Sequence, residues 1–166
     1  MLFPALTLVH VLISLAAIAY GFTAVFAMIA GRIPKSINSW FLVTTILTSI
    51  TGFVLPARQF LPSHALGIIS LVVLAVAGAG YWKYALEGAW RKIYVIGAWL
   101  ALYLNVFVLV VQLFRHVPPL TQLAPTQTEP AFQLAQLATL IAMLTIGVRA
   151  YIGIKNQPGA TASAAA

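Results

Sequence analysis

Cysteine and aspartate are absent from this chain of 166 residues, and glutamate occurs only twice. Without cysteine the chain can form no disulfide, no thiolate metal site, no iron–sulfur cluster and no cysteine-linked haem. Charged residues make up only 7% of the sequence, whereas they make up roughly a quarter of a soluble domain. So few charges cannot cover a surface that faces water, and hydrophobic residues reach 62%. The composition therefore indicates an integral membrane protein.

The scarcity of acidic residues also narrows the possible functions. Glu87 and Glu129 both lie in or beside predicted loops, whereas ion-coupled transporters generally carry carboxylates inside the membrane. The chain contains neither GxSxG nor HExxH, so no hydrolytic motif supports an enzyme. Lysine and arginine are scattered, with no basic run longer than the pair Arg91–Lys92, which argues against a nucleic-acid partner.

Long apolar segments dominate what remains. A helix needs about 20 apolar residues to cross the hydrocarbon core, and five segments reach or approach that length. We expect an all-α, polytopic membrane helix bundle of five transmembrane helices, with one domain over residues 1–155 and a disordered tail over 156–166. The second segment is the shortest and ends before Pro56. The predicted segments are Leu2–Ala30, Trp40–Leu55, Ala65–Leu86, Ile93–Phe114 and Ala131–Ile154.

The basic residues predict how the bundle is oriented. With the N-terminus outside, Arg58 and Arg115 lie outside and the other seven lysines and arginines lie toward the cytoplasm. This distribution follows the positive-inside rule, so we expect an outer N-terminus and a cytoplasmic C-terminus.

Polar side chains inside the predicted spans gather toward the outer side. Small and polar residues recur at steps of three and four along each segment, which is typical of a face that meets other helices. All three histidines and most of the uncharged polar groups fall in the outer half. We therefore predict an outer polar pocket around His10, an ionisable residue inside the membrane. The predicted cofactor-binding residues are His10, His64, Asn105, Gln112, His116 and Gln136.

Several occupants of this pocket are compatible with the sequence. A b-type haem would use His10 and His64, and a divalent metal would use His64, His116 and Glu129. A quinone or another lipophilic ligand would use the polar side chains as hydrogen-bond partners. Electron transfer is one role that such cofactors would support. The alternative is an accessory or structural subunit, or an assembly factor, that has no cofactor and docks in a larger membrane complex or a homo-oligomer.

Two stretches carry a resemblance. LYLNVFVLVVQLF (residues 102–114) and LAPTQTEPAF (residues 123–132) resemble parts of small bacterial multi-pass inner-membrane proteins. The resemblance implies a location in the bacterial cytoplasmic membrane, with the lipid bilayer as the first partner. It implies no particular activity.

Overall fold

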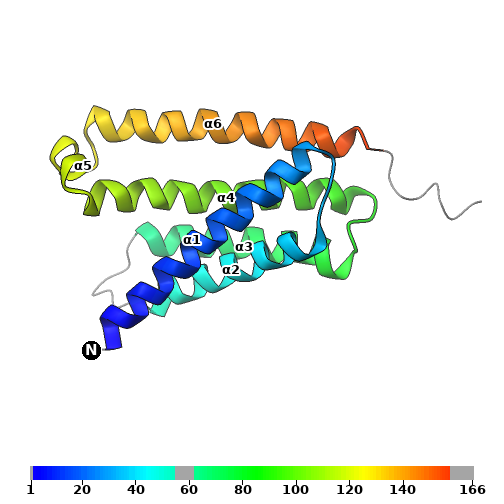
Figure 1. Ribbon diagram of the computed structural model, residues 1–166, viewed down its shortest axis with the longest axis horizontal. Coiled ribbons are helices and arrows are strands. Elements are labelled where there is room, and N and C mark those ends of the chain that lie inside the picture. Colours follow the sequence, from blue (N-terminus) through cyan, green and yellow to red (C-terminus); the bar gives the residue numbers. More distant parts are fainter. Residues whose placement is uncertain (1, 55–61, 158–166) are drawn as a thin grey trace, which may run out of the picture.

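The described part of the chain is all helical. A computed structural model describes residues 2–54 and 62–157, and the side chains of residues 5–54 and 65–157. Five of its helices are long and apolar enough to cross a membrane, which confirms the predicted bundle (Figure 1). The elements are α1 (Leu2–Ile29), α2 (Lys35–Val54), α3 (Pro62–Gly78), the π-helical segment η1 (Ala79–Lys83), α4 (Ala89–His116), α5 (Pro118–Leu123) and α6 (Pro130–Lys155).

The helix boundaries differ from the predicted ones most at three places; α3 also begins three residues earlier than predicted, at Pro62, and α4 ends two residues later, at His116. The second helix begins at Lys35 rather than Trp40, and the fourth begins at Ala89 rather than Ile93. The third helix changes to π-helical geometry after Gly78 instead of continuing to Leu86. Polar or aromatic residues close to these helix ends look like loop residues in the sequence. The predicted tail falls mostly on residues 158–166, which lie outside the described part of the chain.

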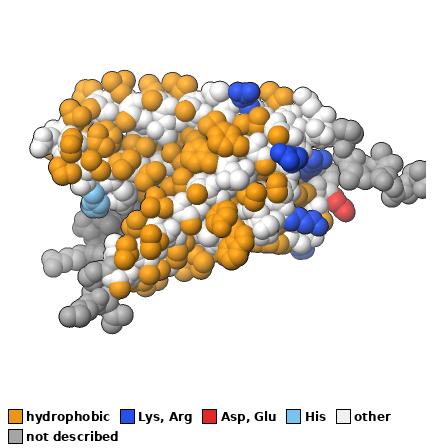
Figure 2. Space-filling view, viewed as in Figure 1, with side chains coloured by type: hydrophobic (Ala, Val, Ile, Leu, Met, Phe, Trp, Pro, Cys, Tyr) orange, Lys and Arg blue, Asp and Glu red, His pale blue; other side chains and the backbone are white. Residues whose placement is uncertain are grey.

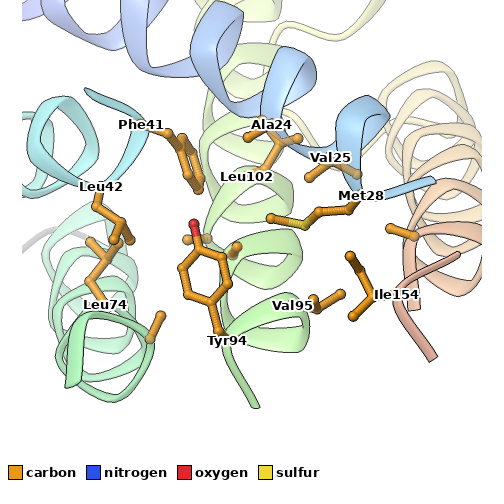
Figure 3. Packing of buried hydrophobic residues seen from close by; sticks show 14 of the residues in the cluster. Ala24, Val25, Met28, Phe41, Leu42, Leu74, Tyr94, Val95, Leu102 and Ile154 are labelled. Carbon is orange, nitrogen blue, oxygen red and sulfur yellow. The ribbon is translucent and has the colours of Figure 1, made fainter. Parts of the chain in front are cut away.

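The hydrophobic core occupies one half of the bundle. It is built from the second half of α1, the first half of α2, the end of α3, the beginning of α4 and buried residues of α6. Figure 3 shows the Tyr94 ring at the centre of this cluster, with Leu42 and Leu74 on one side and Met28 on the other. This half is therefore solidly packed.

A buried polar pair connects α2 to α4 within this core. The Tyr94 hydroxyl donates a hydrogen bond to Asn38 Oδ1, and Asn38 Nδ2 donates to the Pro34 carbonyl over 2.7 Å. Both side chains are fully buried. A buried amide without partners is costly. Because these two bonds satisfy the Asn38 side chain, this polar residue before the apolar run can be buried, and α2 can begin at Lys35.

Helix α1 crosses the bundle diagonally. Its second half approaches α4 where Gly21 faces Leu102, and its C-terminal end meets α6 where Gly153 faces the carbonyl groups of Met28 and Ile29. Toward its N-terminus, α1 runs away from both α4 and α6 (Figure 1). The other half of the bundle is therefore less closely packed than the core.

The surface matches a lipid environment. Large hydrophobic side chains such as Leu8, Val72 and Leu134 are about 60% exposed (59%, 61% and 64%). Lysine and arginine gather at one end of the face seen in Figure 2, and hydrophobic side chains cover most of the rest. We call this end the basic end; the chain order places there Arg32, Lys35, Lys83, Arg91, Lys92, Arg149 and Lys155. The protein is a small multi-pass membrane protein.

Candidate functional site

A cavity of about 420 Å³ lies in the half of the bundle away from the basic end. It is lined by the first half of α1, the end of α2, the beginning of α3 and the second half of α4. On α4 its lining runs from Leu104 to Val117, which at 1.5 Å per residue is about 20 Å. Most of the lining is apolar, and α6 contributes nothing to it. The cavity is the space that remains beside α4 because α1 crosses the bundle diagonally (Figure 1).

His10 lines the cavity and is held by a contact with α2. Its Nδ1 lies 2.8 Å from the Thr51 hydroxyl, and that hydroxyl donates its proton to the Leu47 carbonyl at 2.7 Å. A hydroxyl has one proton, and with that proton directed at the Leu47 carbonyl Thr51 accepts from His10, so we assign the ring hydrogen to Nδ1. We therefore assign Nε2 of the neutral ring as a hydrogen-bond acceptor or metal-ligand atom. Within the described residues Nε2 has no hydrogen-bond partner.

A cluster of hydroxyl groups lies beside His10. Ser49 Oγ donates to Ser70 Oγ over 3.2 Å, which connects α2 to α3. The Thr48 hydroxyl is buried and has no hydrogen-bond partner in the described part of the chain, although Thr48 lines the cavity. A buried hydroxyl without a partner is costly, so a group that bonds to Thr48 would be favoured.

The α4 wall carries three of the predicted residues. Asn105 lies deepest and donates a long bond of 3.4 Å to Thr45 Oγ1. Gln112 and His116 follow one another along the same wall toward the end of α4, and both side chains are exposed. The structure thus brings His10, Asn105, Gln112 and His116 to one cavity.

Two of the other predicted residues, Gln136 and Glu129, lie away from the cavity lining. Gln136 lies against α4, where its Nε2 donates to the Phe107 carbonyl over 3.2 Å, and it is not part of the cavity lining. The side chain of His64 lies outside the described residues. Glu129 belongs to the loop before α6 and bonds within that loop, so the metal site with His64 and His116 stays a prediction. Among the described residues no group of three potential metal ligands comes together.

Glu129 is an electrostatic feature of the loop outside the spans. Some desolvation acts to raise its pKa, but hydrogen bonds from Thr126, Thr128 and its own backbone outweigh it and hold the pKa of this carboxyl below its ordinary value. The threonine donors are the backbone amides of Thr126 and Thr128, both at 3.0 Å, and the Thr126 hydroxyl at 2.8 Å. These bonds stabilise the charged form of Glu129 and hold the loop residues Thr126 and Thr128 against its carboxylate.

Sequence reasoning did not identify Thr48 and Thr51 as site residues. The hydroxyl groups of the second helix are expected to bond to their own backbone, and Thr51 does so. Its second role, as the acceptor for His10, depends on how α1 crosses α2. The separation of 41 residues between the two side chains gives no local signal for this contact.

Comparisons of this chain with protein-family models, with curated proteins and with solved structures gave no match. The resemblance to bacterial inner-membrane proteins therefore stays a prediction. A function has to be argued from the geometry and chemistry of the cavity.

Proposed function

We propose that this protein binds a lipid-soluble ligand in the cavity beside His10, and that the head group of this ligand carries a hydroxyl, as in a quinol or another phenol. The observation that carries the proposal is the 2.8 Å contact between His10 Nδ1 and the Thr51 hydroxyl, from which we assign the ring hydrogen to Nδ1. That assignment leaves an acceptor nitrogen, Nε2, on a residue that lines a mostly apolar cavity.

The size and lining of the cavity support a ligand of this kind. Its volume of about 420 Å³ falls within the range of small-molecule sites, which are mostly apolar and contain a few well-placed polar groups. The lining on α4 is about 20 Å long, so a head group beside His10 leaves room for an apolar tail. A ligand dissolved in the bilayer would reach the cavity beside α1.

Two groups would recognise the head group. His10 Nε2 accepts a hydrogen bond from a ligand hydroxyl, and the unpartnered Thr48 hydroxyl donates one to a ligand oxygen. A quinol offers both functions, whereas a quinone carbonyl can only accept. His10 therefore favours the reduced form of such a molecule.

The distribution of charge supports an orientation and a location. The cavity lies away from the basic end, which carries seven lysines and arginines and one glutamate. By the positive-inside rule this end faces the cytoplasm, so the cavity opens toward the outer leaflet. We infer the cytoplasmic membrane of a bacterium as the location. A reporter enzyme fused to the C-terminus would test the orientation.

The experiment uses the protein purified in mild detergent. Thermal stabilisation by a decyl-substituted benzoquinol and by the matching benzoquinone gives the affinity for each form. We expect His10→Ala to weaken benzoquinol binding about ten-fold, because one buried hydrogen-bond partner is lost. Thr23→Val is the matched control, since Thr23 lies on α1 outside the cavity and its hydroxyl bonds, among the described residues, to the Ala19 carbonyl alone.

The same preparation distinguishes the alternatives. Equal benzoquinol affinity of the wild type and His10→Ala would contradict the proposal. An absorption spectrum with a Soret band that shifts on addition of dithionite would identify haem as the ligand instead. A colourless protein that binds neither form and is recovered in a defined larger complex would favour an accessory subunit.

A further inference from the structure

A second depression lies on the opposite half of the bundle, between α2 and the end of α3. Its volume is about 490 Å³, and it opens on the surface of the bundle. It runs along α3 and η1 from Leu71 to Lys83, a length of about 18 Å at 1.5 Å per residue. One leaflet accounts for half of the hydrocarbon core, or about 15 Å. The groove is therefore as long as one leaflet is thick.

Small residues make the floor of this groove and an aromatic ring forms its end. Ala75 and Ala79 leave space that larger side chains would fill. The Trp82 indole folds back over Gly78, because a Cβ on Gly78 would lie 2.9 Å from Trp82 Cζ3. Tryptophan is enriched at the level of lipid head groups, so this end of the groove suits the membrane interface.

The change to π-helical geometry brings a positive charge to the same end. Lys83 is the last residue of η1, lines the groove and has an exposed side chain. π-Helical segments are rare and occur frequently at functional sites. Here the segment brings an aromatic ring and an ammonium group to the mouth of one apolar groove.

The start of α2 adds to the positive potential there. The Tyr81 hydroxyl donates to the Lys35 carbonyl over 2.7 Å, which holds the first turn of α2 against η1. This turn contributes the Lys35 side chain and the positive end of a helix dipole. Glu87 is the only acidic residue at this end among the described residues. The charges therefore complement an anion.

We propose that this groove binds one anionic phospholipid from the leaflet at the basic end. An acyl chain lies on the small residues of α3, and the phosphate lies beside Lys83 with Trp82 at the level of the head group. The apolar groove accounts for the binding of the acyl chain. Lys83 accounts for the preference for an anionic head group. This site is separate from the cavity beside His10, and it does not depend on the function proposed for that cavity.

The test is native mass spectrometry of the delipidated full chain, titrated with dioleoyl phosphatidylglycerol or dioleoyl phosphatidylcholine. We expect one tightly bound phosphatidylglycerol per chain. Lys83→Gln should lower its affinity about five-fold, because a basic residue near an anionic lipid contributes about 1 kcal/mol. Lys92→Gln is the matched control, since Lys92 is exposed at the same end but outside the groove.

A second variant tests the groove itself. Ala75 is exposed, so Ala75→Phe fills the groove from the lipid side without disturbing the core. It should lower the binding of both lipids, whereas Ala138→Phe, on an exposed position of α6, should not. Three results would overturn the proposal: equal losses from Lys83→Gln and Lys92→Gln, unchanged binding in Ala75→Phe, or a wild-type dimer that Ala75→Phe converts to a monomer. The last result would mean that a second copy of the chain occupies the groove.

Discussion

Replacing Gly153 with alanine should force α1 and α6 apart. A Cβ at this position would lie 2.5 Å from the Met28 carbonyl oxygen and closer still to that of Ile29. Close contacts between a carbon and a carbonyl oxygen are ordinarily about 3.3 Å or longer, so the helices must separate by about 0.8 Å. No side-chain rotation relieves the contact, because both oxygens belong to the backbone.

The energetic cost follows from this geometry. Overpacking a close contact costs typically about 1–3 kcal/mol, and alanine recovers about 1 kcal/mol through its higher helix propensity. Because the clash is with backbone atoms, its cost lies at the upper end of this range, about 3 kcal/mol, and we expect Gly153→Ala to lower the free energy of unfolding by about 2 kcal/mol. Gly52→Ala is the matched control, because a Cβ there meets only His10 Cε1 at an ordinary 3.6 Å.

Reversible unfolding in mixed micelles, with increasing dodecyl sulfate and circular dichroism as the signal, measures both variants. Gly52→Ala should match the wild type or exceed it by up to about 1 kcal/mol. A Gly153→Ala variant as stable as Gly52→Ala would refute the close approach of the two helices. A loss of stability smaller than about 2 kcal/mol would measure how much of the clash α1 relieves by moving away from α6.

Three further predictions use the same unfolding assay or a variant of it. Tyr94→Phe leaves the buried Asn38 oxygen without its donor and should cost about 1–3 kcal/mol; wild-type stability would contradict the bond. Trp99→Phe removes the 2.6 Å bond to the Met143 carbonyl and should cost about 1 kcal/mol, whereas no loss would mean that the indole only packs. The lowered pKa of Glu129 predicts that its stabilising contribution is complete above the ordinary pKa of the carboxyl and is lost as the pH falls through its lower folded value. The melting temperature of Glu129→Gln should therefore change less between pH 6 and pH 3 than that of the wild type, and identical profiles would rule out this role.

The sequence predicts the α4 wall of the cavity well. Asn105, Gln112 and His116 recur at helical spacing, so they had to lie close to one face of one helix. The same spacing indicates that Gln136 points inward, yet it gives no information about which neighbour it meets. Gln136 meets α4 on the side away from the cavity, because α6 packs there.

Other features depend on contacts between distant parts of the chain. Lys35 to Ser39 looks like a loop in the sequence because it is polar, but Asn38 is buried when Tyr94 donates to it across 56 residues. The choice of the ring nitrogen that carries the hydrogen in His10 likewise depends on Thr51, 41 residues away. These contacts arise from how the helices cross, and the local pattern contains no signal for them.

The hydrogen bonds of α2 also bear on how the chain inserts into the membrane during synthesis. Thr44, Thr45 and Thr51 each donate their hydroxyl proton to a carbonyl one turn earlier. These donors are therefore satisfied as soon as α2 is helical, before any later helix has emerged from the ribosome. Asn38 differs, because its oxygen finds its donor only when α4 arrives. Asn38 lies in the first turn of α2, so it can remain among hydrated lipid head groups until α4 has been made. The hydrogen bond from Tyr94 would then complete the insertion of α2.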